Sequence, residues 1–90
     1  MFTIECQYIG SKTTLSWKKG KLEGDFFLGM EVKEMIKNTR SWDDPAYGTI
    51  KVTMKDPVAV FLIIKHIASN VEITEGSVPS CPSIPEGSYG

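Results

Sequence analysis

Residues 56–68 read DPVAVFLIIKHIA, and their pattern constrains the rest of the architecture. Asp56 can accept the unpaired amides of a first helical turn, and Pro57 at the first helical position loses no hydrogen bond. We therefore expect a helix that runs to about Asn70. Its side chains are apolar nearly all round, so this helix needs cover on more than one side, from the chain itself or from a partner.

The segments around this helix alternate between apolar and polar residues, which is typical of strands with one packed face. Residues 2–9 and 13–18 are expected to form a hairpin, with a brief extension at residues 21–22. Residues 49–55 and 71–74 are expected to form two more strands. The side chains predicted to point inward are Phe2, Ile4, Cys6, Tyr8, Leu15, Trp17, Ile50, Val52, Met54, Val71 and Ile73. Because each strand has one polar face, only one face of the sheet should be packed.

A second, earlier helix is predicted after Asp25, which is a plausible N-cap. Its inward face would carry Leu28, Val32, Met35 and Ile36. Asn38 and Thr39 would end it. Residues 40–48 are expected to be a loop, since Asp43 and Asp44 with the following Pro45 and Gly48 favour turns.

The resulting prediction is an α+β fold, a two-layer sandwich of order ββαβαβ. It has an about four-stranded mixed sheet, both helices on one face and an extended C-terminal arm. The chain has 90 residues, which fits one domain. We assign residues 1–75 to that single α+β domain and residues 76–90 to the arm, which is rich in Pro, Ser and Gly.

The arm has a period of three. Pro79, Pro82 and Pro85 recur with that spacing, and so do Val78, Cys81 and Ile84. Polyproline II has three residues per turn, so each set would line one edge of an extended helix. Two interpretations remain open. The arm folds over the second helix, within the chain or across a dimer, or it is a Pro-x-x-Pro ligand for an aromatic groove.

Composition bears on location and on partners. The net charge is −1 and the apolar share is 41%, which is ordinary for a globular domain and gives no general electrostatic reason to bind nucleic acid or an anionic membrane. The sequence has no signal-peptide pattern and no apolar run of membrane-spanning length. We expect a cytoplasmic protein with no membrane partner, in which the two cysteines, Cys6 and Cys81, are free thiols.

The sequence offers few residues that could support catalysis. His66 is the sole histidine, and with a thiol from Cys6 or Cys81 it could serve a small enzyme. Its position beside Lys65 near a helix end instead favours a surface or capping role. We predict no catalytic, cofactor-binding or metal-binding residues and no cofactor.

Two groups of residues suggest binding surfaces. Arg40, Trp42 and Tyr47 are of the types that anchor interfaces, although Trp42 and Tyr47 could equally fold inward to close the core. With the edge formed by Val78, Cys81 and Ile84 they make up the predicted interaction surface. The second group is Lys18, Lys19 and Lys21 beside Trp17, together with Lys51 and Lys55. These lysines could contact phosphates, or they could simply protect a sheet edge and solubilise a turn.

The leading hypothesis is a small non-enzymatic binding or adaptor protein that acts through protein–protein contacts, with another protein or with itself as a homodimer. The alternative is a nucleic-acid-binding module that uses Lys18, Lys19 and Lys21 at the hairpin tip with Lys51 and Lys55. The second alternative is a small enzyme or enzyme subunit that uses His66.

Overall fold

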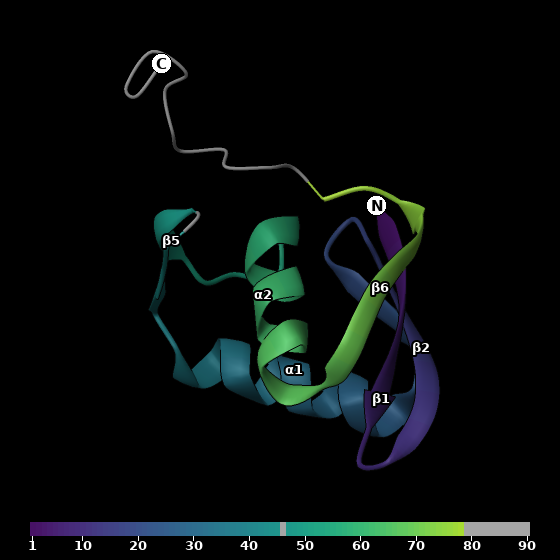
Figure 1. Ribbon diagram of the computed structural model, residues 1–90. Helices are drawn as coiled ribbons and strands as arrows, with labels where there is room; N and C mark the ends of the chain where they lie inside the picture. Colours follow the sequence, from purple (N-terminus) through teal and green to yellow (C-terminus); the bar gives the residue numbers. More distant parts are fainter. Residues whose placement is uncertain (46, 79–90) are drawn as a thin grey trace.

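The computed structural model describes residues 1–45 and 47–78, and in that part of the chain six strands form two antiparallel sheets with two helices (Figure 1). The elements in chain order are β1 (Phe2–Tyr8), β2 (Ser11–Lys18), β3 (Lys21–Gly24), α1 (Phe26–Asn38), β4 (Ser41–Asp44), β5 (Gly48–Lys51), α2 (Pro57–Ile67) and β6 (Ser69–Gly76). The predicted α+β class is confirmed. The arm prediction falls largely on residues 79–90, which lie outside the described residues.

The larger sheet has the strand order β3-β2-β1-β6, so β1 lies between β2 and β6. It has the expected four strands, but the prediction of a mixed sheet is wrong, since every pairing described is antiparallel. The reason is the exit from α2. The helix ends at Ile67 and β6 begins at once, with Asn70 in the left-handed region at φ 53°, so the chain reverses and runs back along β1.

The strand expected at residues 49–55 does not join this sheet. Its first part, β5, pairs instead with β4, in a segment that was predicted to be a loop, and Trp42 lies opposite Ile50. The strand ends at Lys51. The Val52 amide still donates to the Arg40 carbonyl at 3.0 Å, and the Trp17 indole donates a hydrogen bond of 2.7 Å to the Met54 carbonyl. The β4–β5 hairpin is therefore a separate unit, and two strands are too few to be stable without packing on another element.

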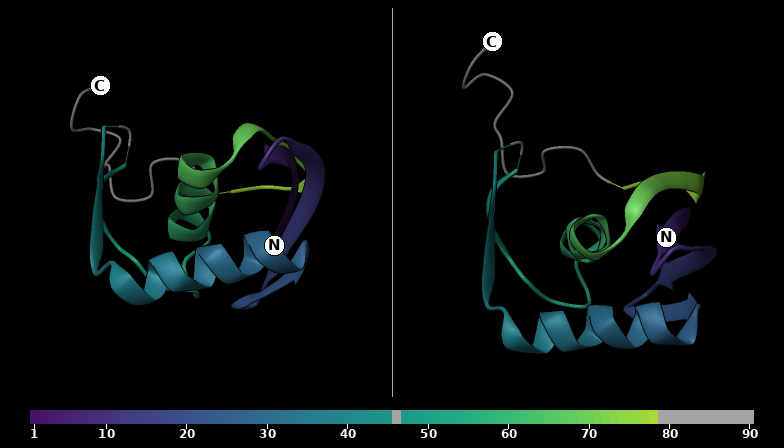
Figure 2. Two further views of the ribbon diagram at one scale, coloured as in Figure 1. Left: turned by 90° about the horizontal axis from the view of Figure 1, so that it is seen from below. Right: turned by 60° about the horizontal axis from the view of Figure 1, so that its bottom comes forward.

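The element on which the β4–β5 hairpin packs is α2. Asp56 caps this helix as predicted, accepting from the Val58 amide at 2.9 Å. Its buried side chains fall into two sets: Val60, Ile63 and Ile64 join the main core, whereas Val58, Ala59 and Leu62 form a second cluster with Ile50. Figure 2 shows α2 between the larger sheet and the hairpin. The expectation that this helix needs cover on more than one side is confirmed, and the hairpin supplies the second cover.

The main core joins the inward face of β1 and β2 to both helices. Its buried members are Phe2, Ile4, Cys6, Leu15, Trp17, Leu28, Val32, Val52, Val60, Ile63 and Ile64. Ile73 was expected to be buried as well, but it is 40% exposed, because β6 is an edge strand with β1 as its one neighbour. Val78, the first residue of the predicted apolar edge of the arm, is half-buried and packs against both hydrophobic clusters.

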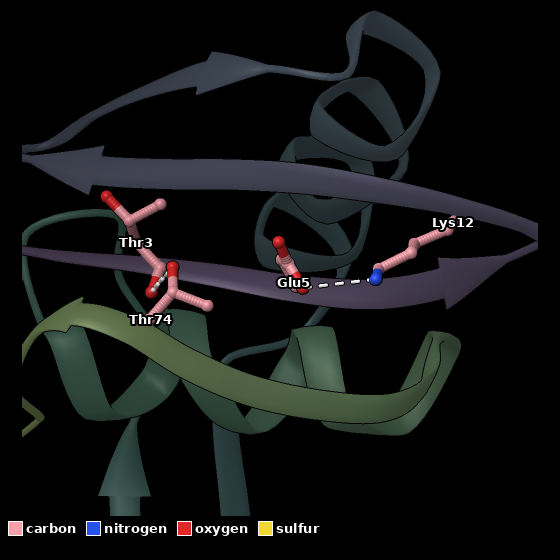
Figure 3. A network of polar contacts seen from close by, with 4 residues as sticks. All are labelled: Thr3, Glu5, Lys12 and Thr74. Carbon is pink, nitrogen blue, oxygen red and sulfur yellow. Dashed lines mark hydrogen bonds and ion pairs between the residues drawn. The ribbon is translucent and has the colours of Figure 1, made fainter.

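The outer face of the larger sheet is polar, as the alternation predicted (Figure 3). The Thr74 hydroxyl donates to the Thr3 carbonyl at 3.3 Å, and Lys12 lies 3.5 Å from the Glu5 carboxylate. Such exposed contacts contribute little to stability. This face therefore keeps the sheet hydrated on one side.

Candidate functional site

Exposed apolar side chains gather around the start of α1. Ile9 in the β1–β2 turn is 83% exposed, Phe26 and Phe27 are 69% and 70% exposed, and Met30 is 52% exposed. The rings of Phe26 and Phe27 meet edge to face, with their centroids 5.5 Å apart. We call these four residues the apolar patch. In Figure 1 the β1–β2 turn and α1 both lie at the bottom of the molecule.

The helix cap sets which side chains are exposed here. Asp25 accepts from the Leu28 amide at 2.9 Å and from the Thr13 hydroxyl at 2.8 Å, which fixes Phe26 as the first helical residue. These two hydrogen bonds, the amide first, hold the pKa of the Asp25 carboxyl below its ordinary value. Because Leu28 and Val32 take the buried face of the helix, Phe27 is left on the outer face.

A groove of about 440 Å³ opens beside Phe27. It is lined by Tyr8, Ile9, Phe27, Met30, Glu31 and Glu34. On the other side of Met30 is a smaller hollow of about 110 Å³, which Phe26 and Lys33 help to line. Met30 therefore forms a ridge between two hollows, one edged by the Glu31 and Glu34 carboxylates and the other by the Lys33 ammonium group and the Asp25 carboxylate.

One wall of the groove is fixed by a contact between β1 and α1. The Tyr8 hydroxyl donates to the Glu31 carboxylate, and this hydrogen bond, with some help from burial, raises the pKa of Tyr8 to about 12. The bond ties the end of the strand to the helix. The groove thus has one wall from each element and does not depend on a single mobile side chain.

The β1–β2 turn has an unusual residue at its tip. Ile9 and Gly10 both have positive φ, 52° and 77°, as a two-residue hairpin turn of type I′ requires. Asn or Asp usually precedes the glycine in such turns, and a β-branched residue at positive φ is an outlier. Strained positions of this kind concentrate at functional sites. Ile9 is 83% exposed and belongs to neither hydrophobic cluster.

Three members of the predicted interaction surface come together elsewhere. Trp42, Tyr47 and Val78 are half-buried and pack against the second hydrophobic cluster, so the aromatic pair lies as its inward alternative describes. Arg40 is exposed, and its carbonyl accepts from the Val52 amide at 3.0 Å. Cys81 and Ile84 lie outside the described residues. Whether this group contacts a partner stays a prediction.

His66 and Cys6, the residues considered for catalysis, lie in different environments, since the first is exposed and the second is buried. His66 is exposed at the end of α2, where its ring meets the Trp42 indole at 5.2 Å between centroids. Cys6 is buried in β1, and burial, followed by the charge of Asp25, raises the pKa of its thiol. A raised pKa disfavours the nucleophilic thiolate. Within residues 1–45 and 47–78, no three potential metal-ligating side chains are grouped together.

The lysines of the predicted nucleic-acid-binding surface lie around the β2–β3 turn and at the end of β5. Lys18, Lys19 and Lys21 are exposed around the β2–β3 turn, and the Cγ of Lys55 lies 3.9 Å from where a Cβ would stand on Gly20. Lys55 therefore joins the hairpin tip. Trp17 does not: it was grouped with these lysines, but it is 7% exposed and points into the core, so it cannot stack on a base. Lys51, at the end of β5, is exposed as well.

The apolar patch was missed at the sequence level. The spacing of Leu28, Val32, Met35 and Ile36 predicted the inner face of α1 but not the character of its outer face. The available signal was that Phe26, Phe27 and Met30 fall off that face by helical periodicity. Three large apolar residues therefore stand on the outer side of an amphipathic helix.

No protein-family model, curated protein or solved structure matches this chain. Among the helices that the structure describes, neither is long and apolar enough to cross a bilayer. The geometry of the exposed surfaces is therefore the remaining guide to function.

Proposed function

We propose that this chain is a small non-enzymatic binding protein that acts through protein–protein contacts, and that the apolar patch is its contact surface. The observation that carries the proposal is the groove of about 440 Å³ with Ile9, Phe27 and Met30 exposed along it. With Phe26, the patch offers on the order of 500 Å² of apolar surface, taking about 150–250 Å² for a whole aromatic side chain. That lies toward the upper end of the largest patch on a typical monomer, roughly 300–600 Å².

The chemistry of the groove favours binding over catalysis. Of its ionisable lining groups, the Glu31 carboxylate is already engaged by the Tyr8 hydroxyl, and Glu34 is an exposed carboxylate at the rim. Histidine and cysteine do not line the groove as the structure describes it. An apolar lining with charges at its edge suits the burial of apolar side chains, with the charges setting register and specificity.

We propose further that residues 1–75 form one domain in which both helices lie on the inner face of the sheet. Residues 76–90 form an arm, and the protein resides in the cytoplasm. Leu28 of α1 and Ile63 of α2 belong to one cluster with Phe2 and Ile4, which supports the two-layer arrangement. The free, buried Cys6 is compatible with a reducing compartment.

The test compares the wild-type chain with the double variant Phe26→Ser/Phe27→Ser. Proteins captured from cells by each chain are identified and purified, and their affinity is measured by calorimetry. We expect at least one partner whose binding weakens about tenfold or more in the double variant, as for loss of aromatic anchors. Ile73→Ser is the matched control, since Ile73 is an exposed apolar residue outside the patch. Partners that bind both chains equally well, or an absence of binding to any protein, a second copy of the chain included, would refute the proposal.

A nucleic-acid-binding role is a second candidate, supported by one observation: Lys55 lies beside the β2–β3 turn that carries Lys18, Lys19 and Lys21. Labelled single-stranded RNA and duplex DNA would be titrated at low salt. If the role is real, binding falls steeply as salt is raised, and the Lys18→Ser/Lys19→Ser/Lys21→Ser variant loses it. Binding no tighter than that of an acidic control protein removes this candidate.

A further inference from the structure

We infer that the partner seated on the apolar patch is a second copy of this chain, with the two α1 helices parallel about a two-fold axis. This inference depends on the proposed function, because it uses the same surface. It adds the identity of the partner and the orientation of the contact.

The outer face of α1 carries opposite charges on its two flanks. Residues three and four apart share a helical face, so Lys33 and Lys37 lie on the flank of Phe26, and Glu31 and Glu34 lie on the flank of Phe27. The hollows agree with this division. Lys33 lines the hollow beside Phe26, where the Asp25 carboxylate is held by the Leu28 amide and the Thr13 hydroxyl, and both glutamates line the groove beside Phe27. The apolar residues form a strip between a basic flank and an acidic flank.

Symmetry then selects the partner and its direction. A two-fold axis parallel to the helices places the basic flank of one copy against the acidic flank of the other, on both sides of the strip. An axis that makes the helices antiparallel places each flank against its own like, which is repulsive. A uniformly basic partner would satisfy Glu31 and Glu34 but would oppose Lys33 and Lys37. A second copy in the parallel arrangement satisfies both flanks.

The available area is adequate for such a contact. The four side chains of the patch supply on the order of 500 Å² of apolar surface per copy. The charged flanks around them bring each copy near the roughly 800 Å² that a specific interface of standard size buries per partner. Met30 on its ridge and Phe27 beside the groove can fill the hollows of the facing copy, as anchors at the centre of an interface do. The interface would have an apolar centre and a charged rim.

Sedimentation equilibrium on the full chain from about 1 µM to about 500 µM tests the inference. We expect a reversible dimer within that range. Met30→Asp, at a half-exposed position, is expected to be monomeric throughout with an unchanged far-UV spectrum. Glu34→Lys leaves the acidic flank with no net charge, because Glu31 remains, and Lys33→Glu/Lys37→Glu makes both flanks acidic. Each alone should weaken self-association about tenfold or more, and a mixture of the two should form heterodimers.

The relative orientation of the two α1 helices is measured separately, by cysteine cross-linking. In a Cys81→Ser background, a mixture of Phe26→Cys and Phe27→Cys chains is expected to form an intermolecular disulfide on mild oxidation, because the parallel arrangement places the flank of Phe26 in one copy against the flank of Phe27 in the other. Lys19→Cys, on the distant β2–β3 turn, is the control and should not cross-link. Failure of this mixture to cross-link in a dimeric sample overturns the parallel arrangement. A wild-type chain that stays monomeric at about 500 µM overturns the self-association, and if an identified partner then binds in a Phe26- and Phe27-dependent way, the proposed function stands without it.

Discussion

Truncation of Leu62 to alanine tests whether the β4–β5 hairpin truly covers the second side of α2. Leu62 is 8% exposed and packs with Ile50, Val58 and Ala59. Removing a buried leucine side chain forfeits about 2 kcal/mol of transfer free energy, and the cavity that remains brings the usual cost to about 2–5 kcal/mol. Since Leu62 lies near the rim of a small cluster, we expect about 2–3 kcal/mol. That is a large part of the roughly 5–10 kcal/mol expected for a domain of this size.

The assay is urea and thermal unfolding followed by far-UV circular dichroism at about 1 µM, where self-association does not add to stability. The melting temperature should fall by about 10–20 °C, at roughly 4–8 °C per kcal/mol. Phe27→Ala is the control: its side chain is 70% exposed, so the change should stay within about 0.5 kcal/mol. If Leu62→Ala behaves like the control, the hairpin does not cover α2 and the account of the second cluster is refuted.

Three further outcomes follow from local geometry. Gly24→Ala should destabilise the chain well beyond Gly20→Ala, although both glycines have positive φ, because a Cβ at Gly24 would stand 2.5 Å from the Thr14 carbonyl oxygen and one at Gly20 meets no atom closer than 3.9 Å. Equal denaturation midpoints for the two variants would contradict this. Tyr8 has a pKa raised from 10.0 to about 12 by Glu31, so its contribution is present below pH 10 and is lost as pH rises toward 12. The difference in urea midpoint between wild type and Tyr8→Phe should shrink over that window, and a constant difference would count against the contact. Asp56→Ala should cost about 1 kcal/mol through loss of the α2 cap whereas Asp56→Asn should cost little, and thermal melts that do not separate the two variants would argue against the cap.

The features that sequence reasoning predicted well are those fixed by local chemistry. Asp25 and Asp56 cap helices where their carboxylates were expected to do so, because a capping carboxylate needs only its own first turn. The inward positions Phe2, Ile4 and Leu15 followed from the period of two in a strand with one packed face. Such signals do not depend on how distant segments meet.

The features that sequence reasoning missed depend on which segments of the chain pair with each other. Residues 49–55 alternate as a strand of the main sheet would, yet alternation carries no information about the neighbour, and Ile50 pairs with Trp42 in a separate hairpin. The same limit applies to the sheet direction, which was set by the tight reversal at Asn70. At the candidate site, the sequence suggested Trp42 and Tyr47 as anchors by residue type, but residue type alone does not say whether an aromatic seals its own core or meets a partner.

The composition of each helix suggests a role, internal packing or contact with a partner, that the structure gives to the other helix. α2 is the more apolar, and on composition alone it is the helix in need of a partner, but the sheet and the β4–β5 hairpin enclose it and leave its apolar surface inside the molecule. α1 is amphipathic and reads as self-sufficient, yet its outer side carries Phe26, Phe27 and Met30. Stability and association should therefore separate between the helices. Leu62→Ala should lower the melting temperature and leave the dimer constant of the folded chain unchanged, whereas Met30→Asp should abolish the dimer and leave the monomer's melting temperature unchanged. A variant of either helix that moved both quantities together would show that the patch is part of the fold and not a surface reserved for a second molecule.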